Sequence, residues 1–319
     1  MSLTAEEFQQ YILNNRKEFI TLSRQQEREL GRLYISFASQ AKMEAAYIVD
    51  KKSLTYAAKR KLINNLLQKA ANLTDNFKSY LDKSILETAG LKTEVEKIIA
   101  GRYQGRLQGI GVDLDLVGLI QDVPDRTLRL AYARIWKDGL KLSDRIWILN
   151  RRTKQELERI ILEEIAAGRS ASSKVLEARL NNLLSPDRRA IKTTLHGRSV
   201  SFDAARLLRT ERTLAYREAD RMAAMANPGN RGIKWKLSLA ERYCSTCKNI
   251  ASADKYGLGP GIYPAEQMPS IPHPQCMCTT YQVTISTDEL VKDWTEWMDN
   301  KSTHPEITEW YNTYYRKAA

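Results

Sequence analysis

The chain has 319 residues, and its 50 Lys and Arg against 38 Asp and Glu give a formal net charge of +12. This length can form one large domain or two smaller ones with a hydrophobic core, so no bound metal is needed to hold the whole chain together. No run approaches the roughly 18 apolar residues of a membrane span, and the first residues lack the pattern of a signal peptide. These features exclude a membrane-spanning protein and predict a soluble one, made and used in a reducing cytoplasm.

The first part of the chain, to about residue 227, has helical periodicity almost throughout. Ser23, followed three residues later by Gln26, matches a capping box and predicts a long helix from there to Tyr47. A second helix is expected to begin within residues 53–55, because an apolar stripe at helical spacing starts at Leu62. The two helices are expected to pack as an antiparallel hairpin.

Glycines interrupt the pattern in the middle of the chain, at positions 101, 105, 109 and 111, and Pro124 follows them. We expect a boundary between helical regions here. Beyond it, short helices are expected over residues 125–140, 143–152, 155–167 and 170–184. Trp136 and Trp147 are expected in the core.

The last long helix, expected from Phe202 to Met225, carries a carboxylate on its apolar face. That face is formed at helical spacing by Ala204, Leu208, Ala215, Ala219 and Met222. Glu211 lies inside this stripe, and an isolated buried charge is highly unfavourable. We therefore expect Glu211 to pair with an arginine or with backbone N–H groups of the loop that carries the cysteines. A role as general acid is the alternative.

All four cysteines lie in two clusters, Cys244-Ser-Thr-Cys247 and His273-Pro-Gln-Cys276-Met-Cys278. Thiolates and an imidazole at these spacings are the ligands of a tetrahedral zinc site, here with five candidates for four positions. Cys244, Cys247 and Cys278 are the firmest candidates, and His273 or Cys276 completes the set. Two disulfides are the alternative, but C-x-x-C and C-x-C spacings suit a shared metal better.

The ligand chemistry predicts one structural zinc ion. Catalytic zinc usually keeps an open position for water, and a thiolate-rich set donates so much charge that bound water is poorly acidified. Strands expected over residues 232–239 and 279–285 form a small ribbon around the clusters. The long loop between them, rich in glycine and proline, would be closed by the metal.

The sequence thus predicts a mainly α fold: helical hairpins or a bundle, then a small zinc-stabilised β-ribbon and loop knuckle, then a short helical tail. The expected regions are an N-terminal hairpin region over 1–100, a helical core over 101–227, the knuckle over 228–285 and an aromatic tail over 286–319. The tail is rich in aromatic residues, at positions 294, 297, 310, 311, 314 and 315. They are expected to dock back onto the body or to anchor a partner protein.

Basic residues are concentrated between Pro186 and Tyr243, where 13 Lys and Arg face six Asp and Glu. Such a stretch favours a phosphate backbone. The expected DNA contacts are Arg206, Arg209, Arg212, Arg217, Lys234 and Lys236. The alternative is a solvated helix face rich in arginine.

Three stretches together resemble the phage Mu protein F-like family of minor head proteins. They are Arg206-Leu-Leu-Arg-Thr-Glu-Arg-Thr-Leu-Ala, then Lys234-Trp235 leading into Arg242-Tyr-Cys-Ser-Thr-Cys247, then Pro272-His-Pro-Gln-Cys-Met-Cys278. The matching part covers about residues 142–285. The resemblance implies that Arg209, Thr210, Glu211 and Trp235 are structural signature residues, and that both cysteine clusters form the metal knuckle.

The resemblance further implies a bacteriophage virion component, a minor capsid protein that acts in head morphogenesis and in packaging or ejection of DNA. Its implied partners are the portal protein, the major capsid protein and double-stranded viral DNA, bound without sequence preference. Its place would be the capsid interior or portal vertex, after assembly in the host cytoplasm.

We do not expect an enzyme. The alternative is a zinc-dependent nuclease or another DNA-processing enzyme, which would need further histidines near a second metal. Only His196 and His304 remain, and neither has a helper nearby in the sequence.

Overall fold

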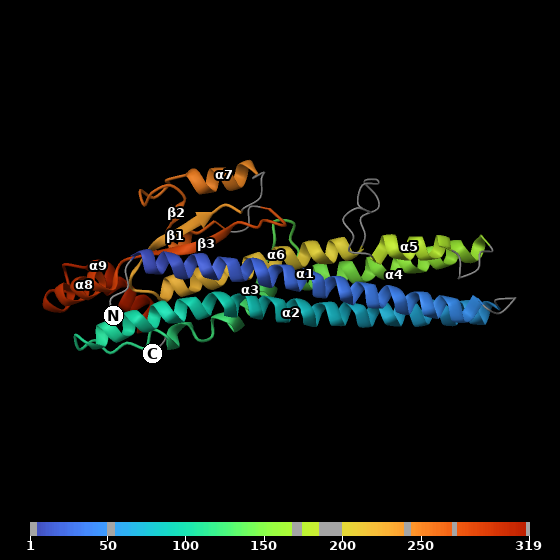
Figure 1. Ribbon diagram of the computed structural model, residues 1–319, viewed down its shortest axis with the longest axis horizontal. Helices are drawn as coiled ribbons and strands as arrows, with labels where there is room; N and C mark the ends of the chain where they lie inside the picture. The colour runs from blue at the N-terminus through green and yellow to red at the C-terminus, as the bar shows by residue number, and fades with distance from the viewer. Residues whose placement is uncertain are drawn as a thin grey trace. The chain divides into compact units, whose positions relative to one another are not determined.

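The computed structural model describes residues 5–49, 55–167, 174–184, 200–238, 244–269 and 273–316. Its described part is mainly helical with one small sheet, which confirms the expected fold class in that respect (Figure 1). None of the helices in these ranges is long and apolar enough to cross a membrane. The cap expected within 170–173, His196 and several basic residues of the 186–243 stretch, at positions 188, 189, 192, 198 and 242, lie outside the described residues.

Six helices precede the sheet: α1 (Ala5–Val49), α2 (Tyr56–Gln108), α3 (Val123–Ala133), α4 (Leu142–Ala166), α5 (Lys174–Leu184) and α6 (Val200–Ala226). Three follow its first strand: α7 (Ser245–Ser252), α8 (Thr287–Asp299) and α9 (Pro305–Trp310). A π-helical turn, Tyr311–Tyr315, ends the described chain.

Helices α1 and α2 pair antiparallel, as expected. Near one end Asn15 Nδ2 donates to the Leu91 carbonyl at 2.8 Å, and further along Tyr80 donates its hydroxyl proton to the Gln26 carbonyl at 2.7 Å. The start of α2 is also confirmed, because Thr55 Oγ1 accepts the Ala58 N–H at 3.2 Å and so caps the helix.

Several expected boundaries are wrong. The capping box at Ser23 is not a helix start, because α1 begins at Ala5 and both Ser23 and Gln26 are buried inside it. Helix α2 continues through Gly101 and Gly105, and ends only before Gly111, whose φ of 82° the helix cannot accommodate. The two helices expected within 143–167 form one helix, α4.

The chain forms two compact units that are interleaved along the sequence. Unit 1 contains residues 1–22, 85–130 and 209–319, and unit 2 contains residues 23–84 and 131–208. The units therefore cut across the four consecutive regions that the sequence suggested.

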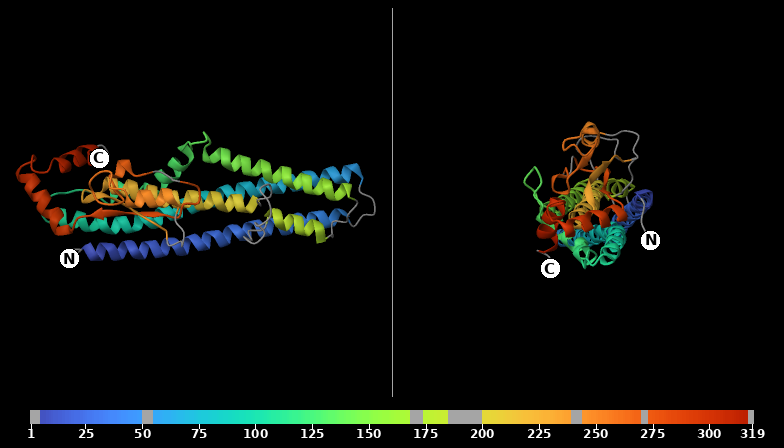
Figure 2. Two further views of the ribbon diagram at one scale, coloured as in Figure 1. Left: turned by 90° about the horizontal axis from the view of Figure 1, so that it is seen from above. Right: turned by 90° about the vertical axis from the view of Figure 1, so that its left-hand side faces the viewer.

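The aromatic tail docks onto the body of unit 1. Trp294 and Trp310 are buried in one cluster with Phe8 of α1 and Tyr103 of α2. Figure 2 shows the C-terminal helices beside the C-terminal end of α2. The docking alternative for the tail is thus confirmed, because its indole rings fill a core to which α1 and α2 both contribute.

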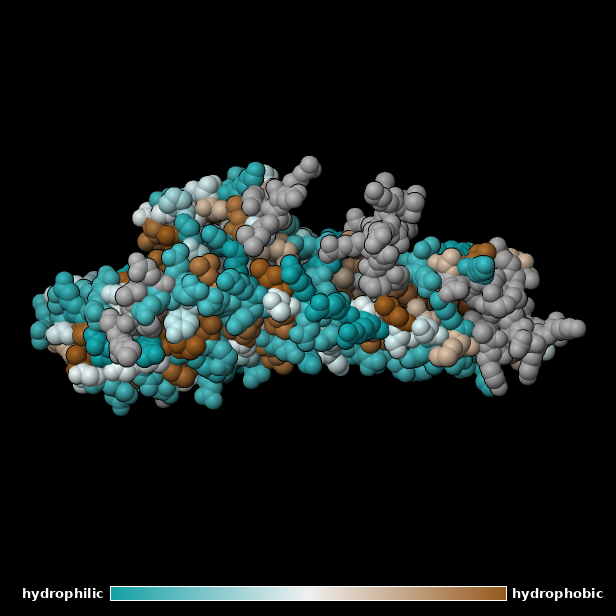
Figure 3. Space-filling model, in the orientation of Figure 1, coloured by the Kyte–Doolittle hydropathy of each residue, from teal (hydrophilic) through white to brown (hydrophobic). Residues whose placement is uncertain are grey.

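Neither tryptophan expected in the core of the middle region is fully buried. Trp147 is 58% exposed and stacks with Arg151, whose guanidinium lies 4.7 Å from the ring centroid. Trp136 is half-buried and stacks in the same way with Arg145 at 4.8 Å. On the face in Figure 3, the hydrophobic residues, drawn in brown, are scattered among hydrophilic ones.

The sheet has three strands in the order β2-β1-β3, all antiparallel. The expected strands correspond to β1 (Asn230–Lys236) and β3 (Thr279–Thr284), and β2 (Ile262–Tyr263) arises from the loop between them. In β1 the side chains alternate: Ile233 and Trp235 are buried, whereas Lys236 is exposed. Helix α7 lies over this sheet (Figure 1).

A buried ion-pair network lies in the core of unit 1. Lys92 Nζ is 2.6 Å from Glu96 Oε1 and 2.9 Å from Asp220 Oδ1. Burial raises the pKa of Glu96, and Lys92 offsets only part of that rise. Gln282 of β3 donates to the second Glu96 oxygen at 2.6 Å, so the network ties α2 and α6 to the sheet.

Candidate metal centre

The first cysteine pair lies at the start of α7. Cys244 is the N-cap residue of this helix, and its Sγ accepts the backbone N–H of Cys247 at 3.2 Å. A hydrogen bond of this kind stabilises a charged sulfur and orients it for a cation. Cys247 is buried, whereas Cys244 is exposed, so the pair reaches from the interior to the surface.

The second cluster brings its donor atoms to Cys247. The Cys247 sulfur lies 3.4 Å from His273 Nε2 and 3.7 Å from the Cys276 sulfur. In a tetrahedral zinc site, bonds of about 2.0–2.3 Å place ligand atoms about 3.4–3.8 Å apart. Both distances therefore match donors that share one ion.

The five candidates form two overlapping groups. Cys244, Cys247 and His273 form one triplet, and Cys247, Cys276 and Cys278 form the other, with all donor atoms of a triplet within 4.8 Å of one another. Cys247 belongs to both. The structure thus brings all five predicted ligands to one place and makes Cys247 their common member. All four cysteines are free thiols in the structure.

The imidazole of His273 is oriented by its own loop. Its Nδ1 lies 2.8 Å from the carbonyl oxygen of Pro274. A carbonyl only accepts, so this hydrogen bond exists when Nδ1 carries the proton. The lone pair of Nε2 then faces Cys247, which is the arrangement that metal-binding histidines commonly show.

Helix α6 holds the second cluster in place. Thr210 Oγ1 accepts the backbone N–H of Gln275 at 3.0 Å, and Arg209 donates to the Gln275 side-chain oxygen at 3.3 Å. Gln275 has a positive φ of 61°, an uncommon conformation for a residue with a side chain. These two contacts stabilise that turn, and Thr213 adds a contact from its hydroxyl to the Met277 sulfur at 3.7 Å.

Two further signature residues, Glu211 and Trp235, are buried. Glu211 is 1% exposed, which confirms its place inside the α6 stripe. Its neighbours Arg209 and Thr210 hydrogen-bond to Gln275 in the loop that carries the second cluster. Trp235 is 1% exposed and packs with Cys247, Cys276 and Cys278 in one cluster.

Arg217 belongs to the cysteine site, although the sequence analysis predicted that it contacts DNA. It is 6% exposed, and its guanidinium lies 4.7 Å from the centroid of the Trp235 ring. Burial lowers its pKa, and the sulfurs of Cys276, Cys278 and Cys247 act against that decrease. An arginine in the helix before a cysteine motif would be the only sequence signal for this role, and it is a weak one.

The sulfurs differ in their acid strength. The pKa of Cys276 is lowered to about 5, because Cys278 donates a hydrogen bond to its sulfur and Arg217 lies beside it. The pKa of Cys247 is raised to about 12, chiefly by burial. The pKa of Cys278 is raised as well, first by that same hydrogen bond. The thiolate form is therefore most favoured at Cys276.

The expected DNA contacts divide into buried and accessible side chains. Arg212 and Arg217 are buried, at 0% and 6% exposed, so their side chains offer no surface to a phosphate and we do not carry that role forward for them. Arg206, Arg209 and Lys234 are half-buried and Lys236 is exposed. For these four, contact with DNA stays a prediction.

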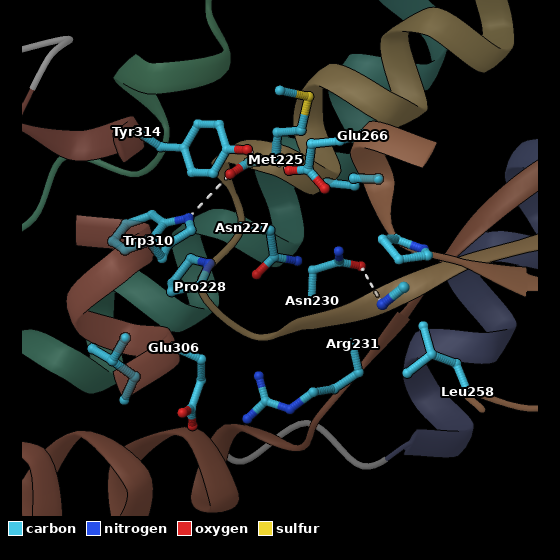
Figure 4. Close-up of a pocket in the computed structure, with 15 residues that line it drawn as sticks. Met225, Asn227, Pro228, Asn230, Arg231, Leu258, Glu266, Glu306, Trp310 and Tyr314 are labelled. Atoms are coloured by element: carbon cyan, nitrogen blue, oxygen red, sulfur yellow. Dashed lines mark hydrogen bonds between the residues drawn. The ribbon is translucent and has the colours of Figure 1, made fainter. Parts of the chain in front are cut away.

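A second candidate site is a hollow of about 250 Å³ at the end of α6 (Figure 4). Its polar groups are paired with one another: Trp310 donates to the Met225 carbonyl at 3.1 Å, and Tyr314 donates to Glu266. Arg231, also in its lining, pairs with Asp293 at 2.9 Å. These contacts hold the C-terminal tail against the rest of unit 1. The hollow is therefore better explained as a gap left between packed segments than as a ligand site.

Of the two histidines outside the cysteine clusters, only His304 is described. It lies between Glu296 and Glu306, 3.0 Å from an oxygen of each, and far along the chain from the cysteines.

Comparisons of the chain with protein-family models, with curated proteins and with solved structures find no match.

Proposed function

We propose that the two cysteine clusters hold one zinc ion with a structural role. The donor set supports this: sulfur and imidazole nitrogen at 3.4–3.7 Å from the Cys247 sulfur are the ligands and spacings that zinc prefers. Cys244, Cys247, His273, Cys276 and Cys278 would supply the ligands. The ion would fix α7 and the loop before β3 to the small sheet.

We further propose that the protein is a minor head protein of a tailed bacteriophage that acts in head morphogenesis and in DNA packaging or ejection. One observation carries this proposal beyond the sequence resemblance. The R-T-E helix and the H-P-Q-C-M-C loop, some 65 residues apart, are in direct contact through Thr210 and Gln275. The contact supports reading these motifs as one unit.

The proposed partners are the portal protein, the major capsid protein and double-stranded viral DNA. Lys236 and the half-buried Arg206, Arg209 and Lys234 supply the positive charge for non-specific contact with phosphates. The proposed place is the virion, at the capsid interior or portal vertex, after assembly in the host cytoplasm. We propose no enzymatic activity.

The metal is tested by measuring zinc in the purified full-length chain. We expect about one equivalent of zinc. Cys247→Ser removes the donor that both triplets share and is expected to abolish binding, whereas Ser252→Ala, on the same helix but outside the cluster, is expected to leave it unchanged. Equal zinc content in Cys247→Ser and the parent chain would contradict the proposal.

The biological role is tested by quantitative mass spectrometry of purified phage particles. A few to a few tens of copies per particle, against the portal and major capsid proteins, would support a minor head protein. Absence from particles would favour the alternative, a zinc-dependent nuclease or another DNA-processing enzyme. That alternative predicts cleavage of DNA in the presence of a divalent metal and loss of cleavage in Glu211→Gln.

A further inference from the structure

The guanidinium of Arg217 is buried, and among the described residues no carboxylate forms an ion pair with it. Its Nε and Nη1 atoms have no hydrogen-bond partner within the described part of the chain. The guanidinium lies over the Trp235 ring, which packs in one cluster with Cys247, Cys276 and Cys278, and these three sulfurs act on it electrostatically. A guanidinium stays charged in proteins, and an uncompensated buried charge is strongly destabilising. The cysteine cluster must therefore carry negative charge that compensates Arg217.

The sign and size of that charge depend on the ligand set. Zinc with four thiolates carries a net charge of minus two, whereas zinc with three thiolates and one neutral imidazole carries minus one. Only the second set is neutralised by a single guanidinium. His273 Nε2 already lies 3.4 Å from the Cys247 sulfur, so an imidazole is available as the fourth ligand.

We propose that the site binds zinc through three cysteine thiolates and His273, and that Arg217 is its counter-cation, held beside the ligand sulfurs by Trp235. This inference rests on the proposed zinc site. Arg217 is a positioning residue here, since it acts on the ligand sulfurs and does not bind the ion. The Trp235 ring, 4.7 Å from the guanidinium, fixes the planar group so that it faces the sulfurs.

The first test measures zinc affinity by competition with a chromophoric chelator. Arg217→Met is expected to weaken binding by about 10- to 100-fold, the usual effect of removing a residue that contacts the metal ligands. Arg217→Lys keeps the charge but loses the planar stack, and is expected to lie between Arg217→Met and the parent chain. Arg221→Met is the matched control: one turn further along α6, Arg221 pairs with Glu218 at 3.0 Å, and its loss is expected to leave zinc affinity unchanged.

A second measurement separates this role from a merely structural one. We expect Arg217→Met to lower the unfolding temperature of the zinc-loaded chain, but to raise it or leave it unchanged after zinc is removed, because the variant no longer buries an uncompensated charge. An arginine that only fills space would be lost at similar cost in both states. Equal destabilisation in both states, or unchanged zinc affinity, overturns the counter-cation role.

Cobalt substitution tests the ligand set itself. The absorption bands of the cobalt-loaded parent chain are expected to show tetrahedral coordination by three thiolates, and His273→Ala is expected to change them. A four-thiolate spectrum that His273→Ala leaves unaltered overturns the proposed set. A parent chain that binds neither zinc nor cobalt would contradict the proposed metal site, a failure distinguishable from loss of the Arg217 role alone.

Discussion

Lys92 and Asp220 form an ion pair of 2.9 Å in which neither side chain is exposed to solvent. Burial alone lowers the pKa of Lys92, but Asp220 and Glu96 more than offset it, so the pKa is raised well above its usual value. The ammonium group therefore stays charged inside the core of unit 1. It binds together two helices whose residues here are far apart in the sequence.

Removal of this cation leaves two carboxylates facing each other in the interior. Lys92→Met is expected to lower the free energy of unfolding by about 3–5 kcal/mol, as measured by urea denaturation. Lys97→Met is the control, because Lys97 pairs with Glu94 at the surface and its loss is expected to cost at most about 1 kcal/mol. Comparable stability of the two variants would show that the buried pair is not needed.

The segment between β1 and β3 contains two glycines with nearly the same φ but different surroundings. Gly257 has φ of 69° and open space around it, whereas at Gly261, with φ of 71°, an added Cβ would lie 2.5 Å from the Ala251 carbonyl oxygen. Gly257→Ala is expected to cost about 1–2 kcal/mol from its backbone conformation alone.

Gly261→Ala adds a steric clash and is expected to cost a further 1–3 kcal/mol or so. It also disturbs the hydrogen bond from the Trp235 N–H to the Gly261 carbonyl, at 2.8 Å. Thermal unfolding of both variants checks the difference. If both substitutions lower the stability equally, the backbone near Ala251 moves to accommodate the added methyl group without a loss of stability.

The two lysines of β1 provide a test of DNA binding. We expect the double variant Lys234→Gln and Lys236→Gln to weaken duplex binding regardless of sequence, and to reduce the slope of log affinity against log salt by about one unit per lysine. Lys137→Gln with Lys141→Gln changes the net charge equally at two exposed positions elsewhere. Equal salt slopes for the two double variants would remove β1 from the proposed interface.

His304 gives the tail a pH-dependent contact. Hydrogen bonds to Glu296 and then Glu306 raise its pKa above the ordinary value of 6.5. A raised folded-state pKa stabilises the fold fully below the unfolded value, and this contribution is lost as the pH rises through the folded value. His304→Gln is therefore expected to destabilise the chain more at about pH 5 than at about pH 8. A titration midpoint of His304 at or below 6.5 in NMR spectra would contradict this.

Much of this architecture follows from sequence patterns. Apolar spacing predicts the buried stripe of α6 and places Glu211 within it, and ligand spacing predicts that both cysteine clusters share one site. The start of α2 after Thr55 and the position of β3 also agree with local signals. These features depend on residues close together in the chain, where the rules of periodicity, capping and metal geometry apply directly.

The wrong predictions of burial and of helix boundaries have one physical cause. Whether a side chain is buried depends on segments that lie far away in the sequence. Helix α6 is buried on all sides between Thr210 and Arg217, so the assumption of one apolar and one solvated face fails there. The spacing that places Glu211 inside also applies to Arg212, four residues after Leu208, but its charge suggested a surface position. The buried Ser23 and Gln26 misled the capping prediction in the same way.

The interleaving of the two units has a consequence for the order in which the chain becomes ordered during synthesis. Unit 2 ends at residue 208, whereas unit 1 needs the first 22 residues together with the last 111. Tyr216, which donates to Asn15 at 2.7 Å, emerges 201 residues after it. At about 5–20 residues per second, synthesis of these 201 residues takes about 10–40 s. Phe8 meets Tyr103 of α2 well before that, whereas Phe19 lacks its ring contact with Tyr216 until about two-thirds of the chain has been made. The first helix can therefore pair with α2 early, but the core of unit 1 closes only when α6 and the residues after it have been synthesised.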